Sequence, residues 1–120
     1  MSYLKLQIGG KERELRFTQM SVEIYSKNVN WDAVDSTSLY ATFFAGLTTA
    51  CYANQEQPDF TFADVIGWVD ELINDEKTVE LQQVNDAFAE TQAFKKFLKR
   101  LEDKVKEAVE ENGHIKKKKA

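Results

Sequence analysis

The chain has 120 residues, of which 42% are hydrophobic and 30% charged, and its net charge is −4 at pH 7. These values are typical of one globular domain and exclude the disordered, collagen-like and disulfide-scaffold classes. The chain has one cysteine, no signal-peptide pattern at its start and no apolar run approaching the ~18 residues of a membrane span. We therefore expect a soluble intracellular protein that does not enter a membrane.

Enzymatic chemistry is not expected, because the residues it needs are scarce. The single histidine, His114, lies in a Gly- and Lys-rich end, and the single cysteine, Cys51, lies in an apolar stretch typical of a core. A zinc site needs three or four converging ligands, and a catalytic triad needs a rigidly held histidine. We expect no catalytic residues, no metal and no cofactor.

Residues 3–17 predict a β-hairpin. Apolar and polar residues alternate on both sides of Gly9-Gly10, a pair that supplies the positive φ angles of a tight turn. Because two strands alone are marginal in water, the apolar face of the hairpin must pack on helices.

Two helices are predicted next. Thr18 is the expected N-cap of the first, which ends at Asn28 or Asn30. Its apolar face carries Met20, Ile24 and Tyr25. Asp35 and Ser36 are candidate caps of the second helix, whose apolar residues repeat at helical spacing from 39 to 51. Gly46 lies inside that helix, where glycine costs ~1 kcal/mol relative to alanine and indicates the close approach of another element.

The middle of the chain predicts a loop and a short helix. Residues 54–59 are polar and contain the only proline, and Thr61 with Asp64 forms a capping-box pattern. Trp68 lies on the flank of the apolar stripe of the following helix, so we expect it to be partly buried with its indole N–H at the rim. Residues 74–77 break the pattern.

The last part of the chain predicts a long helical region. Thr78 is the expected cap, the apolar stripe changes phase near Glu90, and Gly113 supplies a stop, so the pattern allows one kinked helix or two. The late stripe exceeds what so small a domain can cover. Its residues therefore face the rest of the domain, another copy of the chain or a client; they are Phe94, Phe97, Leu98, Leu101, Val105 and Val109.

Together these elements predict an α+β fold, mostly α, in which an N-terminal β-hairpin packs on a bundle of four to five helices. The single domain covers residues 1–113, with the hairpin at 3–17 and the helical part at 18–112, and a disordered basic tail follows at 114–120. The residues expected to share one core are Leu6, Ile8, Leu15, Phe17, Phe43, Leu47, Val65, Val69 and Phe88.

Charge is distributed unevenly. Residues 95–120 carry ten Lys or Arg and five acids, whereas residues 1–94 carry six and fifteen. This asymmetry fits a solvated helical surface with a basic tail, an acidic body that attracts a basic partner, or a tail that touches nucleic acid. An acidic whole argues against DNA as the main ligand, because phosphate binding needs clustered cations on a folded face. The acids from Asp70 to Glu76 lack the spacing of a calcium loop, which favours a solvated helix end.

Four stretches occur in a characteristic order: LKLQIGGK leading to LRF at residues 4–17, ATFFAGL at 41–47, FTFADV at 60–65 and DAFAETQAFKKFL at 86–98. Together they resemble the tail assembly chaperones of long-tailed, siphovirus-like bacteriophages over residues 3–101. The resemblance implies a helical, non-enzymatic protein of the infected host's bacterial cytoplasm that is absent from the mature virion. It also implies two partners, the phage tape measure protein and the tail tube protein.

The lysine run at residues 116–119 has three interpretations. It is a solubilising tail or tag, a nucleic-acid arm, or the translation of an A-rich tract. In many tail assembly chaperones a programmed frameshift near the end of the short form yields a longer form. The third interpretation fits that habit, with this chain as the short form.

A chaperone of this kind needs an apolar surface for a helical client and an acidic rim for specificity and release. The candidate partner-binding residues are Trp68, Asp70, Glu71, Phe94, Phe97, Leu98 and Leu101. Two alternatives come from other classes of protein. One is a structural tail or head-completion subunit of the particle, and the other is a small nucleic-acid-associated regulator that uses the basic helix at residues 95–106.

Overall fold

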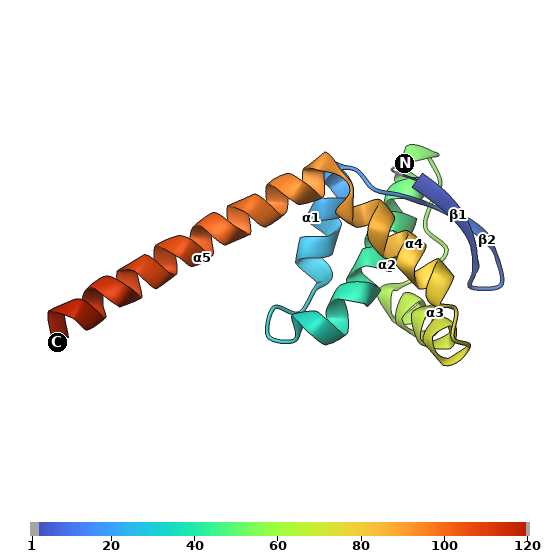
Figure 1. Cartoon of the computed structure of the whole chain (residues 1–120). Coiled ribbons are helices and arrows are strands. Elements are labelled where there is room, and N and C mark those ends of the chain that lie inside the picture. The colour runs from blue at the N-terminus through green and yellow to red at the C-terminus, as the bar shows by residue number, and fades with distance from the viewer. Residues whose placement is uncertain (1–2, 120) are drawn as a thin grey trace.

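The computed structural model describes the backbone of residues 3–119 and the side chains of residues 3–33 and 37–107. The fold is mostly α with a small N-terminal hairpin, as predicted (Figure 1). In chain order the elements are β1 (Tyr3–Ile8), β2 (Lys11–Arg16), α1 (Gln19–Asn28), α2 (Val34–Ala53), α3 (Phe62–Asn74), α4 (Thr78–Ala89) and α5 (Gln92–Lys119).

The two strands form the predicted antiparallel hairpin. The register runs from Tyr3 opposite Arg16 to Ile8 opposite Lys11. Gly9 and Gly10 occupy the turn at φ +63° and +84°, which side chains with a Cβ rarely adopt. The apolar face of the hairpin packs on α2 and α4.

Helix α2 is the centre of the fold, because it contacts α1, β2, α3 and α4. Nine of its ten residues from 41 to 50 are buried, so apolar side chains are needed on every side of the helix. A Cβ on Gly46 would lie 2.6 Å from Cζ of Phe17 and 3.2 Å from Cβ of Leu15. The close approach that the sequence predicted at Gly46 is therefore that of β2 and the residue that follows it.

The predicted core is confirmed. All nine residues expected to share it are buried in one cluster. Met20 was wrongly placed on the buried face of α1, since its side chain is 45% exposed. Ser21 is buried instead, and its hydroxyl donates to the carbonyl of Arg16 while its Oγ accepts from the backbone N–H of Thr18. These hydrogen bonds orient α1 so that Ser21, and not the neighbouring Met20, faces the core.

The helix starts are partly as expected. Thr18 and Thr61 are the N-caps of α1 and α3, and at α3 the backbone N–H of Thr61 donates to Asp64 (2.9 Å). The expected caps Asp35 and Ser36 are wrong, because α2 already begins at residue 34; their side chains lie outside the described residues. Thr78 is likewise the first residue of α4 rather than its cap.

The last region forms two helices that meet at residues 90–91. The hydroxyl of Thr91 donates to the carbonyl of Phe88 (2.8 Å) and accepts from the backbone N–H of Phe94 (3.1 Å), so one side chain ends α4 and begins α5. Helix α5 runs past Gly113, where the sequence predicted its end, because a single glycine lowers helix stability by only ~1 kcal/mol. The basic tail predicted as disordered at 114–120 and the stripe residue Val109 lie outside the residues whose side chains are described.

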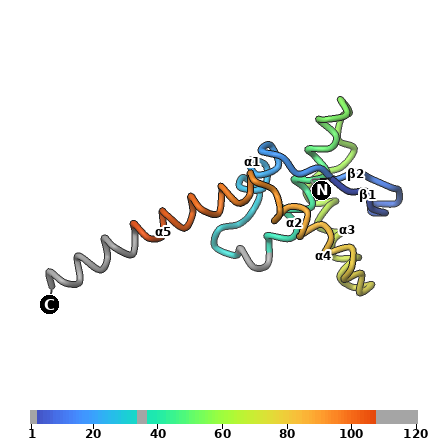
Figure 2. Tube along the Cα trace, turned by 45° about the horizontal axis from the view of Figure 1, so that its top comes forward, coloured from blue at the N-terminus to red at the C-terminus, as the bar shows by residue number. Residues whose placement is uncertain are grey.

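Helix α5 leaves the rest of the fold. It contacts α1 and α4 and then continues away from the body, which we define as residues 3–91 (Figures 1 and 2). Among the described residues, no helix is both long enough and apolar enough to cross a membrane.

Candidate partner-binding surface

The seven candidate residues fall into two groups on different parts of the fold. Trp68, Asp70 and Glu71 lie on α3, whereas the other four lie on α5. Helix α3 packs on α2 and α4 beside the hairpin, and α5 begins at α1 and extends in the other direction (Figures 1 and 2). The structure therefore does not join the two groups into one site.

Trp68 is engaged by the hairpin. The guanidinium of Arg13 lies 4.6 Å from the centre of its ring, and the ring of Phe60 lies 5.8 Å away. A Cβ on Gly9 would lie 2.6 Å from the indole, so the turn rests directly on Trp68. The side chain is half-buried as predicted, and its contacts assign it to holding the hairpin turn.

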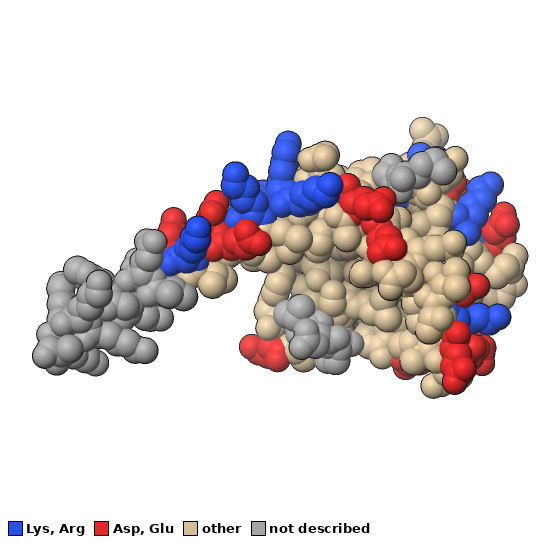
Figure 3. Space-filling view, viewed as in Figure 1, with Lys and Arg blue, Asp and Glu red and all other residues tan. Residues whose placement is uncertain are grey.

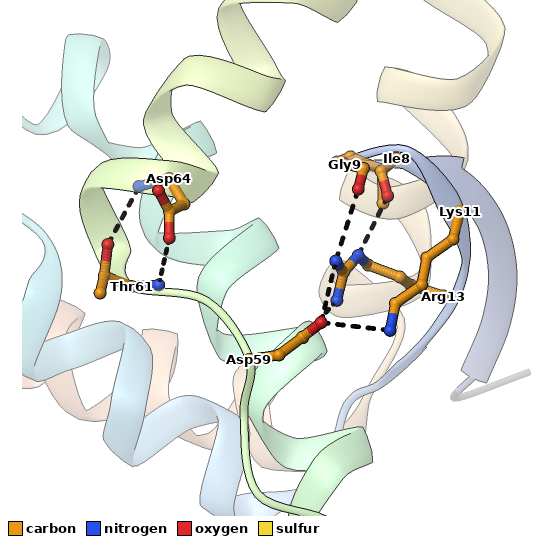
Figure 4. A network of polar contacts seen from close by, with 7 residues as sticks. All are labelled: Ile8, Gly9, Lys11, Arg13, Asp59, Thr61 and Asp64. Atoms are coloured by element: carbon orange, nitrogen blue, oxygen red, sulfur yellow. Dashed lines mark hydrogen bonds and ion pairs between the residues drawn. The ribbon is translucent and has the colours of Figure 1, made fainter.

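Arg13 organises a polar network that ties the loop before α3 to the hairpin (Figure 4). Its guanidinium donates to the carbonyl of Ile8 (3.0 Å) and to Asp59 Oδ1 (2.7 Å), and Lys11 Nζ lies 3.1 Å from Asp59 Oδ2. The hydrogen bonds from Arg13 and Lys11 hold the pKa of Asp59 well below its usual range. Sequence reasoning missed this network because Arg13 and Asp59 are 46 residues apart.

Asp70 of α3 is held by a hydrogen bond to α2. Tyr40 donates its hydroxyl proton to Asp70 Oδ1 (2.6 Å), and this hydrogen bond raises the pKa of Tyr40. Asp70 thereby ties α3 to α2, while Glu71 is exposed. Within the part of the chain with described side chains, no group of His, Cys, Asp and Glu could hold a metal ion.

Cys51 lies at the edge of a hollow of about 270 Å³ beside the Arg13 network. Its side chain is half-buried, and this burial, together with the charge of Glu56, raises the pKa of the thiol. A thiol held protonated is a poor nucleophile. Cys51 therefore contributes to packing, and the hollow has no activated nucleophile in it.

The root of α5 is anchored by aromatic rings. Phe94 lies 4.3 Å from Phe88 and 6.0 Å from Tyr25, measured between ring centres. Phe97 lies 6.2 Å from both Tyr25 and Trp31. Both phenylalanines are half-buried, so these two candidate residues attach α5 to the body.

Beyond this root, the apolar side chains of α5 up to residue 107 are exposed or line a shallow hollow. Leu98 and Val105 are 42% and 61% exposed, and Leu101 lines a shallow hollow of about 350 Å³ with Phe97, Arg100 and Lys104. We call Leu98, Leu101 and Val105 the α5 stripe. Trp31, which the sequence analysis overlooked, is 50% exposed at the start of the stripe. Trp31 could have been noticed in the sequence as an isolated aromatic residue in a polar segment.

The α5 stripe is set among cations. Between residues 92 and 107 the helix has six Lys or Arg and three acids, whereas the body has six and fifteen. Figure 3 shows a group of blue side chains where α5 leaves the body, with red ones among them further along the helix, and both colours on the body. The acids expected to form a rim for the client lie on the body, whereas cations outnumber acids between residues 92 and 107.

No protein-family model, curated protein or solved structure matches the chain. The α5 stripe and the cations around it are therefore the features that bear on function. A helix that leaves its body with exposed apolar side chains among cations has the chemistry of a docking element, since apolar contact supplies affinity and charge supplies selectivity.

Proposed function

We propose that this chain is a non-enzymatic tail assembly chaperone of a bacteriophage, in its short form. In this role it binds the tape measure protein through the α5 stripe and promotes polymerisation of the tail tube around it. The protein acts in the host bacterial cytoplasm and is absent from the mature virion. The observation that carries the proposal is the exposure of Leu98 and Val105 on a helix that extends from the body.

The physical logic is that of one helix protecting another. A tape measure protein is a long, largely helical chain whose apolar stripes would aggregate before assembly. An amphipathic helix covers such a stripe by packing its own apolar side chains at i, i+3, i+4 and i+7 against it. The cations around the α5 stripe speed the encounter with acidic segments of the client, and the apolar contact sets how long the complex lasts.

The test is co-expression with the tape measure protein encoded downstream. The soluble fraction of the client is expected to rise with the chain present and to fall again with Leu98→Ser and Val105→Ser together. Met20→Ser is the control, because the exposed fraction of Met20 (45%) is close to that of Leu98 (42%) but Met20 lies on α1. Client solubility that is the same with and without the chain would refute the chaperone proposal and favour a structural tail or head-completion subunit. Mass spectrometry of purified virions then tests that alternative, since a structural subunit must be present in them.

A second candidate function, a nucleic-acid-associated regulator, is supported by one observation. Lys95, Lys96, Lys99 and Arg100 follow one another within two turns of α5, and all are exposed. Binding to duplex DNA that weakens steeply with salt would favour this candidate, because phosphate contacts release counterions. Lys99→Gln with Arg100→Gln is then expected to reduce the salt slope by roughly two, at about one per phosphate contact.

A further inference from the structure

We propose that α5 of one copy docks onto a groove along α4 of a second copy. The inference goes beyond the proposed function and does not depend on it. The donor is the part of α5 beyond its aromatic root, residues 98–107, which is about 15 Å long at about 1.5 Å per residue. It presents the α5 stripe together with four cations, Lys99, Arg100, Lys104 and Lys106, and three acids, Glu102, Asp103 and Glu107.

The acceptor groove consists of two hollows on the outer side of α4. One is about 360 Å³ and lies between α4 and the start of β1, and the other is about 410 Å³ and lies nearer the start of α4. The hollows share Gln83 and Asp86, so they run along the helix. Helix α4 has 12 residues, which makes it about 18 Å long, close to the length of the donor.

The groove has the chemistry that the donor needs. Two exposed apolar side chains line it, Tyr3 at 46% and Val79 at 64%, and these are partners for the α5 stripe. Asp86 and Glu90 line it as well, and Lys5 is the single cation among the described residues of the two hollows. The donor has one more cation than acids and the groove one more acid than cations, so their net charges are opposite in sign around the apolar contacts.

A second copy is the occupant because α5 cannot fill the groove of its own chain. The helix is continuous from residue 92 and points away from α4, so folding back would break it (Figures 1 and 2). Pairing of two α5 helices is disfavoured, since each has twice as many cations as acids between residues 92 and 107. The contact is therefore heterologous, with one donor and one acceptor on each copy, and it generates rings or open chains.

Sedimentation of the full chain over a range of concentrations tests the inference. We expect mass-action self-association that weakens as salt is raised. The donor variant Lys99→Gln/Arg100→Gln and the acceptor variant Asp86→Asn/Glu90→Gln are each expected to associate at least tenfold more weakly than the unchanged chain. Thermal melts of both variants show whether they remain folded.

A mixture of the two variants gives the decisive result. The intact α5 of the acceptor variant meets the intact groove of the donor variant, so a one-to-one complex is expected that grows no further. A chain that stays monomeric at all concentrations would overturn the inference. An acceptor variant that associates as strongly as the unchanged chain would overturn it too, because α5 would then pair elsewhere. Failure here leaves the client test untouched, since that test measures solubility of a different protein.

Discussion

Phe17 lies directly on Gly46: a Cβ added to this glycine would stand 2.6 Å from Cζ of the ring. The contact brings the end of the hairpin against the middle of α2, so the ring occupies the space that a side chain on α2 would fill. Phe17 is 1% exposed and its ring lies 5.3 Å from that of Phe88, which leaves it little room to move. Glycine is therefore required here for packing.

We expect Gly46→Ala to lower the free energy of unfolding by ~1–3 kcal/mol, because overpacking a filled core outweighs the gain in helix propensity. Gly67→Ala is the matched control, since Gly67 lies inside α3 with nothing within 4 Å of an added Cβ. That substitution is expected to stabilise the protein by up to ~1 kcal/mol. Urea unfolding measures both, and equal effects of the two changes would contradict the packing argument.

Phe43→Ala is expected to lower the free energy of unfolding by ~3–5 kcal/mol, because the side chain is fully buried and its removal leaves a cavity. Chemical denaturation is again the measurement. A loss of less than about 1 kcal/mol would mean that Phe43 lies outside the core.

Arg13→Lys is expected to destabilise the protein by ~1–3 kcal/mol, because a lysine cannot reproduce the planar contacts with Asp59, two backbone carbonyls and Trp68. Only 10% of the Arg13 side chain is exposed, against 39% for Arg16. Arg16→Lys is therefore the matched control, with an expected change within ~0.5 kcal/mol. Similar losses in the two variants would show that the Arg13 network adds nothing of its own.

The contribution of Asp59 is expected to depend on pH. Because its pKa is lowered in the folded state, its stabilising effect is fully present above the unfolded pKa of about 3.9 and is lost as the pH falls toward the folded value. The difference in unfolding free energy between the unchanged chain and Asp59→Asn should thus be constant from pH 7 to about 5 and shrink below about 4.

High salt provides the control for this pH experiment. Asp59 is exposed, so roughly 1 M NaCl should reduce the same difference at pH 7. A difference that persists unchanged at low pH and in high salt would show that Asp59 acts through packing or turn geometry instead of its charge.

Local features of this fold could be predicted from the sequence, and the distant ones could not. The Gly9-Gly10 turn and the Thr61–Asp64 cap each depend on residues within three positions of each other, so a short stretch of sequence is enough to predict them. The Arg13–Asp59 pair depends on two segments meeting across 46 residues, and nothing in either segment marks the other.

The candidate site shows the same division. Periodicity found the apolar positions of α5, but it could not distinguish Phe94, which packs on Phe88, from Val105, which is exposed. That distinction depends on where α5 separates from α1, and α1 lies more than 60 residues earlier in the chain. The contacts of Trp68 could not be predicted for a related reason, since Gly9 and Arg13 reach it from the hairpin.

The junction at Thr91 and the aromatic root together set the direction of the α5 stripe relative to the core. A residue inserted between α4 and the Thr91 cap advances α5 by one position, which turns its stripe by about 100° around the helix axis, given about 3.6 residues per turn. Such a change keeps the sequences of β1, β2 and the four preceding helices, but it turns Phe94 and Phe97 away from Phe88 and Tyr25. In evolution, length changes at this two-residue junction therefore re-aim the docking helix only together with substitutions that give its root new contacts with the body.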